Sequence, residues 1–295
     1  NRYVADWCLS HHKPYMITAH GCFNPIAMEI SGWKKWLARH AYLRAALNGA
    51  ICYQALSETE YRVMRAYGIR QPICIIGNGI QLPDMDALPA PDTCLPTDLM
   101  GRKTCLYLGR LHPIKGIDRL LRAWGKLRLS SDWQLVIAGG GEAAYRSELE
   151  TIVHEEKCSN VHFVGVVTGD LKAAWLRHAD LFVLASRSEA FPMALMEAFS
   201  YAMPALITST CGFTEAVRAG AAMEVASTDD DVKDGLEQLL CLQPDQLDLM
   251  GEQALKFVAE HYDWRIICSQ LEAVYSWMRS GSNKPDCLML DDKHI

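Results

Sequence analysis

The 295-residue sequence has no excess of positive charge, no long apolar run and no closely spaced cysteine pair. A formal net charge of −6 argues against nucleic-acid binding, which normally needs a basic surface. No apolar run reaches the roughly 20 residues of a membrane-spanning helix. The first residues lead into polar sequence, so we expect no secretory signal peptide.

The 11 cysteines are scattered without a Cys-x-x-Cys pair, and the histidines show no metal-ligand spacing. An odd number of widely spaced cysteines suits reduced thiols in a cytoplasmic protein better than a disulfide framework. Zinc sites need clustered Cys and His ligands. We therefore expect a cytoplasmic protein without a metal site.

What the sequence does contain is an alternation of short apolar and longer amphipathic segments. Strands are predicted at residues 15–19, 50–56, 73–76, 104–109, 134–138, 161–164, 181–185 and 205–208. Helices are predicted at residues 33–47, 57–68, 117–127, 142–156, 171–178, 192–201, 245–261 and 264–278. Apolar strands between helices indicate an α/β fold with parallel sheets covered on both faces. In this doubly wound arrangement, ligands bind at the carboxyl ends of the strands.

A proline-rich segment divides the chain. Residues 83–96 carry four prolines and are interpreted as a linker. The predicted divisions are a first domain at 1–88, a second at 89–262, a last helix at 263–279 and a polar tail at 280–295. We expect the tail to be frayed.

Two cations follow the strand at 104–109, within residues 109–116 (GRLHPIKG). Arg110 offers a planar fork for phosphate oxygens, and Lys115 offers a compact charge. Either residue alone would be interpreted as a solvated surface charge. Both together, between a buried strand and a helix, indicate a phosphate site.

A second motif, residues 188–199 (SEAFPMALMEAF), follows the strand at 181–185. Pro192 suits the first position of a helix, where its missing N–H costs nothing. The amides of Phe191, Met193 and Ala194 would then lie at a helix N-terminus, where phosphate is favoured. This motif also indicates an anion site.

The same motif carries two carboxylates. Glu197 lies five residues into the predicted helix, about 7 to 8 Å along its axis, which suits a ribose attached to the phosphates. Glu189 lies in the loop, where a sugar would sit, and carboxylates accept hydroxyl pairs well. The alternative for Glu197 is an exposed helix charge, but its helix is otherwise apolar, so the acid needs a partner.

Three further features are less specific. His20 follows the strand at 15–19 and can donate to a phosphate or sugar oxygen, although a lone histidine is usually structural. The glycines at 139–141 allow close backbone approach to a ligand, or serve turn geometry only. The basic, aromatic segment at 33–44 could dock on anionic lipid, but we favour an ordinary surface helix.

Together these residues resemble the retaining family-4 class of GT-B-fold glycosyltransferases over residues 14–278, most strongly at 109–116 and 188–199. The resemblance implies two Rossmann-like, doubly wound domains facing across a cleft. The family's first domain normally begins with strands and a glycine-rich loop that are not seen here. We therefore expect the first domain to be incomplete by roughly 100 residues. Ala190 and Ala185 depart from the glycine and proline that are common in the family.

The resemblance also implies roles for the motif residues. The implied catalytic residues are His20, Arg110, Lys115 and Glu189. The implied donor-binding residues are Gly109, Arg110, Lys115, Gly139, Gly140, Val166, Glu189, Phe191, Pro192, Met193, Ala194 and Glu197. Arg110 and Lys115 would bind the diphosphate, Glu197 the ribose and Glu189 the sugar, while the loop at 165–168 is a candidate for the base. Family members need no metal, and the nucleotide diphosphate-sugar is a substrate, so no cofactor is expected.

We therefore expect a retaining hexosyltransferase that moves a sugar from a nucleotide diphosphate-sugar to a hydroxyl of a glycan or lipid-linked acceptor. The setting would be cell-surface polysaccharide biosynthesis, with possible peripheral contact at the inner face of the plasma membrane. A nucleotide-sugar 2-epimerase of the same fold stays open as an alternative. So does a non-catalytic nucleotide-sugar binder, because fold alone does not decide activity.

Overall fold

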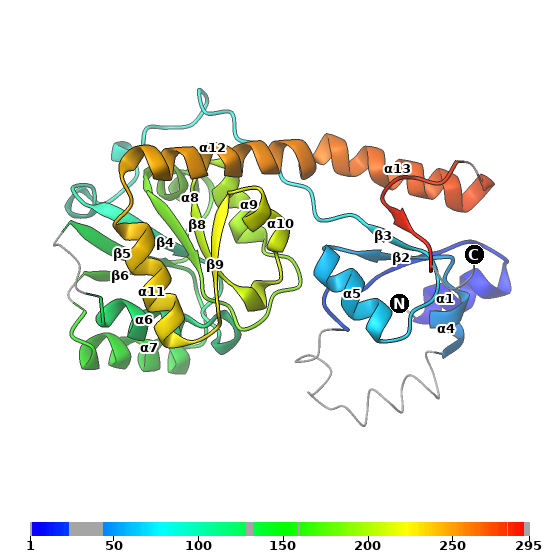
Figure 1. Ribbon diagram of the computed structural model, residues 1–295, viewed down its shortest axis with the longest axis horizontal. Coiled ribbons are helices and arrows are strands. Elements are labelled where there is room, and N and C mark those ends of the chain that lie inside the picture. Colours follow the sequence, from blue (N-terminus) through cyan, green and yellow to red (C-terminus); the bar gives the residue numbers. More distant parts are fainter. Residues whose placement is uncertain (1, 24–43, 128–131, 159, 282, 292–295) are drawn as a thin grey trace. The chain divides into compact units, whose positions relative to one another are not determined.

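The computed structural model describes residues 2–23, 44–127, 132–158, 160–281 and 283–291, and these form two compact units (Figure 1). The first unit comprises Asn1–Gly79 and Trp264–Ile295, and the second comprises Ile80–Asp263. The division falls after Gly79 rather than at residue 88, and the last long helix belongs to the first unit.

The second unit is built on a six-stranded sheet in the order β6-β5-β4-β7-β8-β9, and every pairing is parallel. Its strands are β4 (Lys103–Leu108), β5 (Trp133–Ala138), β6 (Val161–Gly165), β7 (Leu181–Leu184), β8 (Ala205–Thr208) and β9 (Ala222–Val225). The predicted α/β class is confirmed. The order of the strands reverses between β4 and β7, and such a switch point is where doubly wound sheets bind ligands.

Helices cover both faces of this sheet. They are α6 (Ile117–Gly125), α7 (Ala143–Glu155), α8 (Gly169–His178), α9 (Met193–Ser200), α10 (Thr214–Arg218), α11 (Asp229–Leu240) and α12 (Pro244–His261). Short turns of 3₁₀ helix occur at η2 (Pro91–Thr93), η3 (Thr97–Leu99), η4 (Pro113–Lys115) and η5 (Ser209–Cys211). In Figure 1, α6, α7 and α11 lie on one face, and α8, α9 and α12 lie on the other. Two-sided cover explains why β5, β7 and β8 are buried along their whole length.

The sequence patterns were most informative in this unit. Each strand and helix predicted between residues 104 and 208 occurs within about two residues of its expected bounds, which is the usual uncertainty at element ends. The elements β9, α10 and α11 were not predicted. β9 is a half-exposed edge strand of mixed composition. α11 begins with three consecutive aspartates, which mask its apolar face.

The first unit holds a four-stranded sheet in the order β1-β2-β3-β10. Its strands are β1 (Met16–Thr18), β2 (Cys52–Ala55), β3 (Ile73–Ile75) and β10 (Leu288–Met289), and its described helices are α1 (Arg2–Ser10), α4 (Arg44–Gly49), α5 (Glu58–Ala66) and α13 (Trp264–Ser280). The first three strands are parallel, whereas β10 pairs antiparallel with β3. The predicted helix at 33–47, with its lipid-docking alternative, lies mostly outside the described residues.

The expectation of a frayed tail is wrong at β10. Leu288 is fully buried and pairs with Cys74. Pairing with β10 covers what would otherwise be an open edge at β3, and unpaired backbone groups at a sheet edge are unfavourable when buried. The polar composition of the tail did not reveal this pairing, because the partner strand β3 lies more than 200 positions away in the chain.

Helix α5 begins as predicted, with one difference. Ser57 is the N-cap, and its hydroxyl accepts from the amide of Glu60 at 3.2 Å. The carboxylate of Glu60 does not complete the capping box. It accepts instead from the amides of Leu56 at 2.7 Å and Gly21 at 2.6 Å, which ties the turn after β1 to the start of α5.

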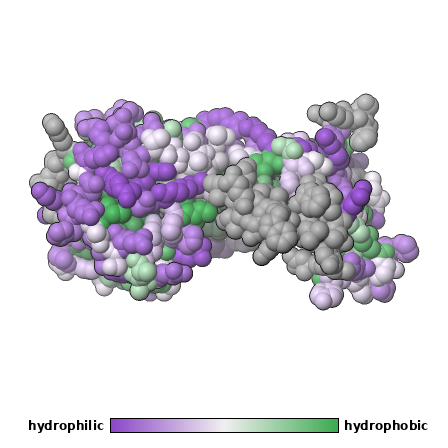
Figure 2. Space-filling model, turned by 90° about the horizontal axis from the view of Figure 1, so that it is seen from below, coloured by the Kyte–Doolittle hydropathy of each residue, from purple (hydrophilic) through white to green (hydrophobic). Residues whose placement is uncertain are grey.

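Two features of the described part of the chain concern membranes and the polarity of the surface. None of the helices in the described part of the chain is both long and apolar enough to cross a bilayer. On the face drawn in Figure 2, the second unit is mainly hydrophilic and its apolar residues form small patches.

Candidate functional site

The two sequence motifs meet at the switch point of the second sheet, because one follows β4 and the other follows β7. These strands pair directly. The backbone N–H of Arg187 donates to the carbonyl of Ile114 at 2.7 Å. Gly116 has a φ of 65°, and a Cβ on it would lie 2.0 Å from the carbonyl oxygen of Ala185. The motif loops are therefore in backbone contact, which glycine permits at this position.

Lys115 and Glu189 form an ion pair across the two loops. The ammonium of Lys115 lies 2.6 Å from Oε1 and 2.9 Å from Oε2 of Glu189. The two side chains are 24% and 8% exposed, so solvent screens the pair only partly. An ammonium and a carboxylate can each make more hydrogen bonds than these. The pair therefore keeps capacity for a phosphate oxygen and a hydroxyl.

Polar groups at the ends of β7 and β8 hold Glu189 in place. The hydroxyl of Ser186 donates to Glu189 Oε1 at 2.6 Å. The carbonyl of Ser186 in turn accepts from the hydroxyls of Thr208 at 2.7 Å and Thr210 at 2.5 Å. Burial raises the pKa of the nearby Cys211 thiol to about 12, and the charge of Glu189 adds to this. Ser186 thus orients the carboxylate of Glu189, and Thr208 and Thr210 hold Ser186 in place.

Glu197 has the partner that its apolar helix required. The ammonium of Lys172, on α8, lies 3.1 Å from Glu197 Oε1. The Lys172 and Glu197 side chains are 34% and 25% exposed, so both can be reached from solvent. A carboxylate has several lone pairs, and one lysine leaves acceptor capacity for hydroxyl groups.

Arg110 lies at the surface of the loop after β4. Its carbonyl accepts from the hydroxyl of Tyr107 at 3.0 Å, which holds the backbone of the loop. The pKa of Tyr107 is raised, mainly by burial and then by the charge of Glu189. No hydrogen bond or ion pair to another described residue occupies the Arg110 guanidinium. It is available to an anion.

The predicted glycines gather with Val166 where β4, β5 and β6 end. The amide of Gly139 donates to the carbonyl of Gly165 at 2.7 Å. A Cβ on Gly139 would lie 1.8 Å from the carbonyl oxygen of Gly109, and one on Gly140 would lie 2.7 Å from Val166 Cγ2. Close backbone packing therefore accounts for Gly139. The side chain of Val166 is 70% exposed beside these glycines and offers an apolar surface to a ligand.

The start of α9 differs from the expectation. Pro192 is the N-cap and not the first helical residue, because its ψ of 74° is not helical and its carbonyl accepts the first bonds of the helix. The amide of Met193 donates to the carbonyl of Phe191 at 3.0 Å and so closes a turn. Ala194 lies in the first turn of the helix. The ring of Phe191 is buried edge-on against Phe213, so this side chain anchors the loop.

His20 belongs to the first unit, where it follows β1 with an exposed side chain. Its φ of 47° lies in the left-handed region, which few residues other than glycine adopt. The bond from Gly21 to Glu60 holds this turn, and strain kept by such bonds is common at functional sites. The role predicted for His20 beside the reacting sugar involves both units and stays a prediction.

Positive charge in the site comes from lysine and arginine side chains. Among the residues that the structure describes, no group of three or more His, Cys, Asp or Glu side chains is arranged to hold a metal ion. The cations on or beside the two motifs include Arg110, Lys115 and, as the partner of Glu197, Lys172. Protein cations and a helix N-terminus can neutralise a bound phosphate.

Three residues of this site were missed by sequence reasoning. Ser186 and Arg187 lie three and two residues before Glu189, and their place just after a strand end could have drawn attention to them. Lys172 gave no local signal, since it is 25 positions from Glu197 and lies on another helix. Only the tertiary fold brings the two charges, on α8 and α9, within 3.1 Å of each other.

Comparison with known proteins identifies the family. The model of the family described as glycosyl transferases group 1 matches residues 98–257, and that of glycosyltransferase family 4 matches residues 2–83. A phosphatidyl-myo-inositol mannosyltransferase of Mycobacterium leprae is 30% identical over 71% of this chain and 54% of its own length. The O-antigen biosynthesis glycosyltransferase WbnH of Escherichia coli is 29% identical over 69% of this chain and 54% of its own length. The chain thus spans about half the length of these curated relatives.

Solved structures show the same fold. Sucrose-phosphate synthase of Thermosynechococcus elongatus has a TM-score of 0.77 at 21% identity, covering 95% of this chain and 72% of that one. HepE of Anabaena, in complex with UDP and glucose, has a TM-score of 0.76 at 16% identity, covering 92% of this chain and 74% of that one. At these identities the likeness concerns the fold. With the family match over more than half of the sequence, the chain belongs to the group 1, family-4 glycosyltransferases and has the GT-B fold.

Proposed function

We propose that this protein transfers a sugar, with retention, from a nucleoside diphosphate-sugar to a hydroxyl of a glycan or lipid-linked acceptor. The observation that carries the proposal is the meeting of Lys115 and Glu189 at the switch point of the second sheet, 2.6 Å apart. A cation for phosphate and a carboxylate for sugar hydroxyls lie together where doubly wound folds bind nucleotides. A hexose is the sugar that we propose, because a mannosyltransferase is among the relatives.

We assign each group a role from its chemistry. Arg110 and Lys115 stabilise the negative charge that develops on the departing diphosphate, and such stabilisation is often the largest catalytic term. Glu189 accepts hydrogen bonds from hydroxyls of the donor sugar and thereby orients the reacting carbon. Glu197, steadied by Lys172, accepts from the ribose hydroxyls. We propose that His20 completes the site near the reacting sugar.

The first test is nucleotide binding. We would titrate the chain by calorimetry with UDP, GDP and ADP, starting with UDP because the structure of HepE holds it. We expect one of the three nucleotides to bind selectively. The variant Glu197→Ala should weaken that binding by about 10- to 100-fold, since a hydrogen bond to a charged group is worth about 1.5–3 kcal/mol.

Two controls make this test specific. Glu150→Ala removes an exposed glutamate that pairs with Arg146 on α7, and it should leave the affinity unchanged. The 2′-deoxy nucleotide should bind wild type more weakly than the ribonucleotide but bind Glu197→Ala about equally. Equal discrimination by both proteins would contradict the ribose role, and no selective binding by wild type would contradict the proposed function.

Product analysis then identifies the reaction. With the bound donor and a mixture of lipid-linked or oligosaccharide acceptors, label from the sugar should enter an acceptor with retained configuration. Conversion of the donor to its 2-epimer without an acceptor would point to the isomerase instead. Binding without any product would point to a nucleotide-sugar binder.

A further inference from the structure

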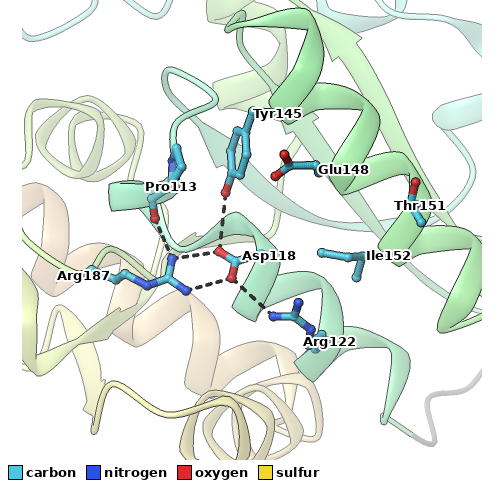
Figure 3. Close-up of a pocket in the computed structure, with 8 residues that line it drawn as sticks. All are labelled: Pro113, Asp118, Arg122, Tyr145, Glu148, Thr151, Ile152 and Arg187. Carbon is cyan, nitrogen blue, oxygen red and sulfur yellow. Dashed lines mark hydrogen bonds and ion pairs between the residues drawn. The ribbon is translucent and has the colours of Figure 1, made fainter.

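A partly buried network of hydrogen bonds lies beside the proposed donor site and joins the loop after β4 to the loop after β7 (Figure 3). The guanidinium of Arg187 donates to both carboxylate oxygens of Asp118, at 2.8 and 2.7 Å. It also donates to the carbonyl of Pro113 at 2.5 Å. Asp118 lies in the first turn of α6 and Pro113 begins η4. One side chain from just before the second motif therefore binds both ends of the segment that carries Lys115.

We infer that Arg187, braced by Asp118, is a positioning residue that holds Lys115 against Glu189 for donor binding. The inference rests on the proposed function. Arg187 stands two residues before Glu189, and its own amide bonds to the carbonyl of Ile114 next to Lys115. Arg187 therefore links the loop of Lys115 to the loop of Glu189 twice, once through its backbone amide and once through its guanidinium.

The chemistry of this link requires arginine. Its planar fork can make two parallel bonds to a carboxylate while another N–H reaches a carbonyl, whereas a lysine ammonium has no such fixed geometry. Burial raises the pKa of Asp118, but the hydrogen bond and charge of Arg187 outweigh this and leave the pKa below its usual value. Asp118 is therefore ionised at neutral pH and keeps its hold on Arg187.

Two further side chains bind Asp118. Tyr145 donates to Asp118 Oδ1 at 3.4 Å, and Arg122 lies 3.3 Å from Oδ2. A cavity of about 440 Å³ borders the network, and Figure 3 shows these side chains around it. Arg122 therefore supplies a matched control. It binds the same carboxylate from the helix that carries Asp118, but among the described residues it forms no hydrogen bond to Pro113 or to the loop of Glu189.

Positioning matters because binding groups must be held closely. A misplacement of about 1 Å can cost about 100-fold in rate, and productive sites hold their groups within about 0.5 Å. Loops are more mobile than the elements they connect. Loss of Arg187 would leave the ion pair of Lys115 and Glu189 with fewer contacts to fix its geometry.

The test is a double-mutant cycle on nucleotide binding. Arg187→Met should weaken binding of the preferred nucleoside diphosphate by about tenfold, whereas Arg122→Gln should change it less than about twofold. In the Lys115→Gln background, Arg187→Met should cost less than about threefold, because the residue through which it acts is gone. The same cost in both backgrounds would overturn the inference, since a purely structural role adds independently of Lys115.

A measurement without ligand separates the inference from the proposed function. Hydrogen exchange of the unliganded protein should accelerate both at 110–116 and at 186–191 in Arg187→Met, but at neither segment in Arg122→Gln. Faster exchange at 186–191 alone would overturn the link between the loops. If wild type binds no nucleoside diphosphate, the proposed function and the role in donor binding fail together. If wild type and Arg187→Met bind equally well, the positioning role fails alone.

Discussion

Replacing Gly116 by alanine tests whether the contact between the two motif loops is as close as the structure shows. The residue has a φ of 65°, and its new Cβ would lie 2.0 Å from the carbonyl oxygen of Ala185. Holding alanine in the left-handed region costs about 1–2 kcal/mol. Relieving the collision requires a backbone shift, and forced overpacking typically costs about 1–3 kcal/mol more. We expect a total loss of about 2–5 kcal/mol in the free energy of unfolding.

Gly169→Ala separates the two contributions. Gly169 also has a left-handed φ, of 53°, but a Cβ there would meet nothing within 4 Å. Gly169→Ala should therefore lower the free energy of unfolding only by the cost of holding alanine in the left-handed region, about 1–2 kcal/mol. Both glycines belong to the second unit, so the same unfolding transition reports on both.

Urea denaturation followed by tryptophan fluorescence measures the difference. Trp124, Trp133 and Trp175 are buried in the second unit and report on its unfolding. With a slope of about 2 kcal/mol per M, Gly116→Ala should lower the midpoint by about 1–2.5 M and Gly169→Ala by less than about 1 M. Equal shifts for the two variants would refute the close approach of the loops.

The remaining predictions concern ionisation. At pH 8 a maleimide should label the exposed cysteines of the native protein rapidly, while Cys211 stays unlabelled until unfolding, because burial raises its pKa to about 12 and thiolates are the reactive form. Mass spectrometry of the labelled peptides checks this, and rapid native labelling of Cys211 would contradict it. Asp118→Asn should lower stability by a constant amount above about pH 5, with the difference shrinking below about pH 4. The reason is that Arg187 keeps the folded pKa of Asp118 below its unfolded value, so the stabilisation is lost as pH falls through the folded pKa. Thermal melts from pH 3 to 8 measure it, and a difference that grows on acidification would contradict the ion pair.

Local sequence pattern predicted the second unit well between residues 104 and 208 because the elements there are specified by their own residues. The apolar run in β5 and the amphipathic pattern of α6 need no distant partner to be recognised. The same holds for the N-cap of α5, where Ser57 and its target lie three positions apart. Glu60 departed from the pattern because Gly21, which is distant in sequence, supplied a competing donor.

The candidate site was predicted as two motifs and their chemistry, but not as a set of contacts. Topology explains why the motifs meet: the reversal of strand order places β4 beside β7, although β5 and β6 intervene in the chain. The pairing of Lys115 with Glu189 joins residues 74 positions apart. Sequence spacing indicated neither the ion pair of Lys172 with Glu197 nor that of Arg187 with Asp118.

By itself, the sequence determined the α/β class, the positions of most elements of the second unit, and the residue types that can bind phosphates and hydroxyls. These depend on periodicity, caps and side-chain chemistry, which act over a few residues. Only the tertiary structure decided which charges neutralise one another, that Pro192 caps α9 instead of beginning it, and that Leu288 closes the edge of the first sheet. Electrostatic and packing energies depend on distance in space, and distance in space is set by how the whole chain folds.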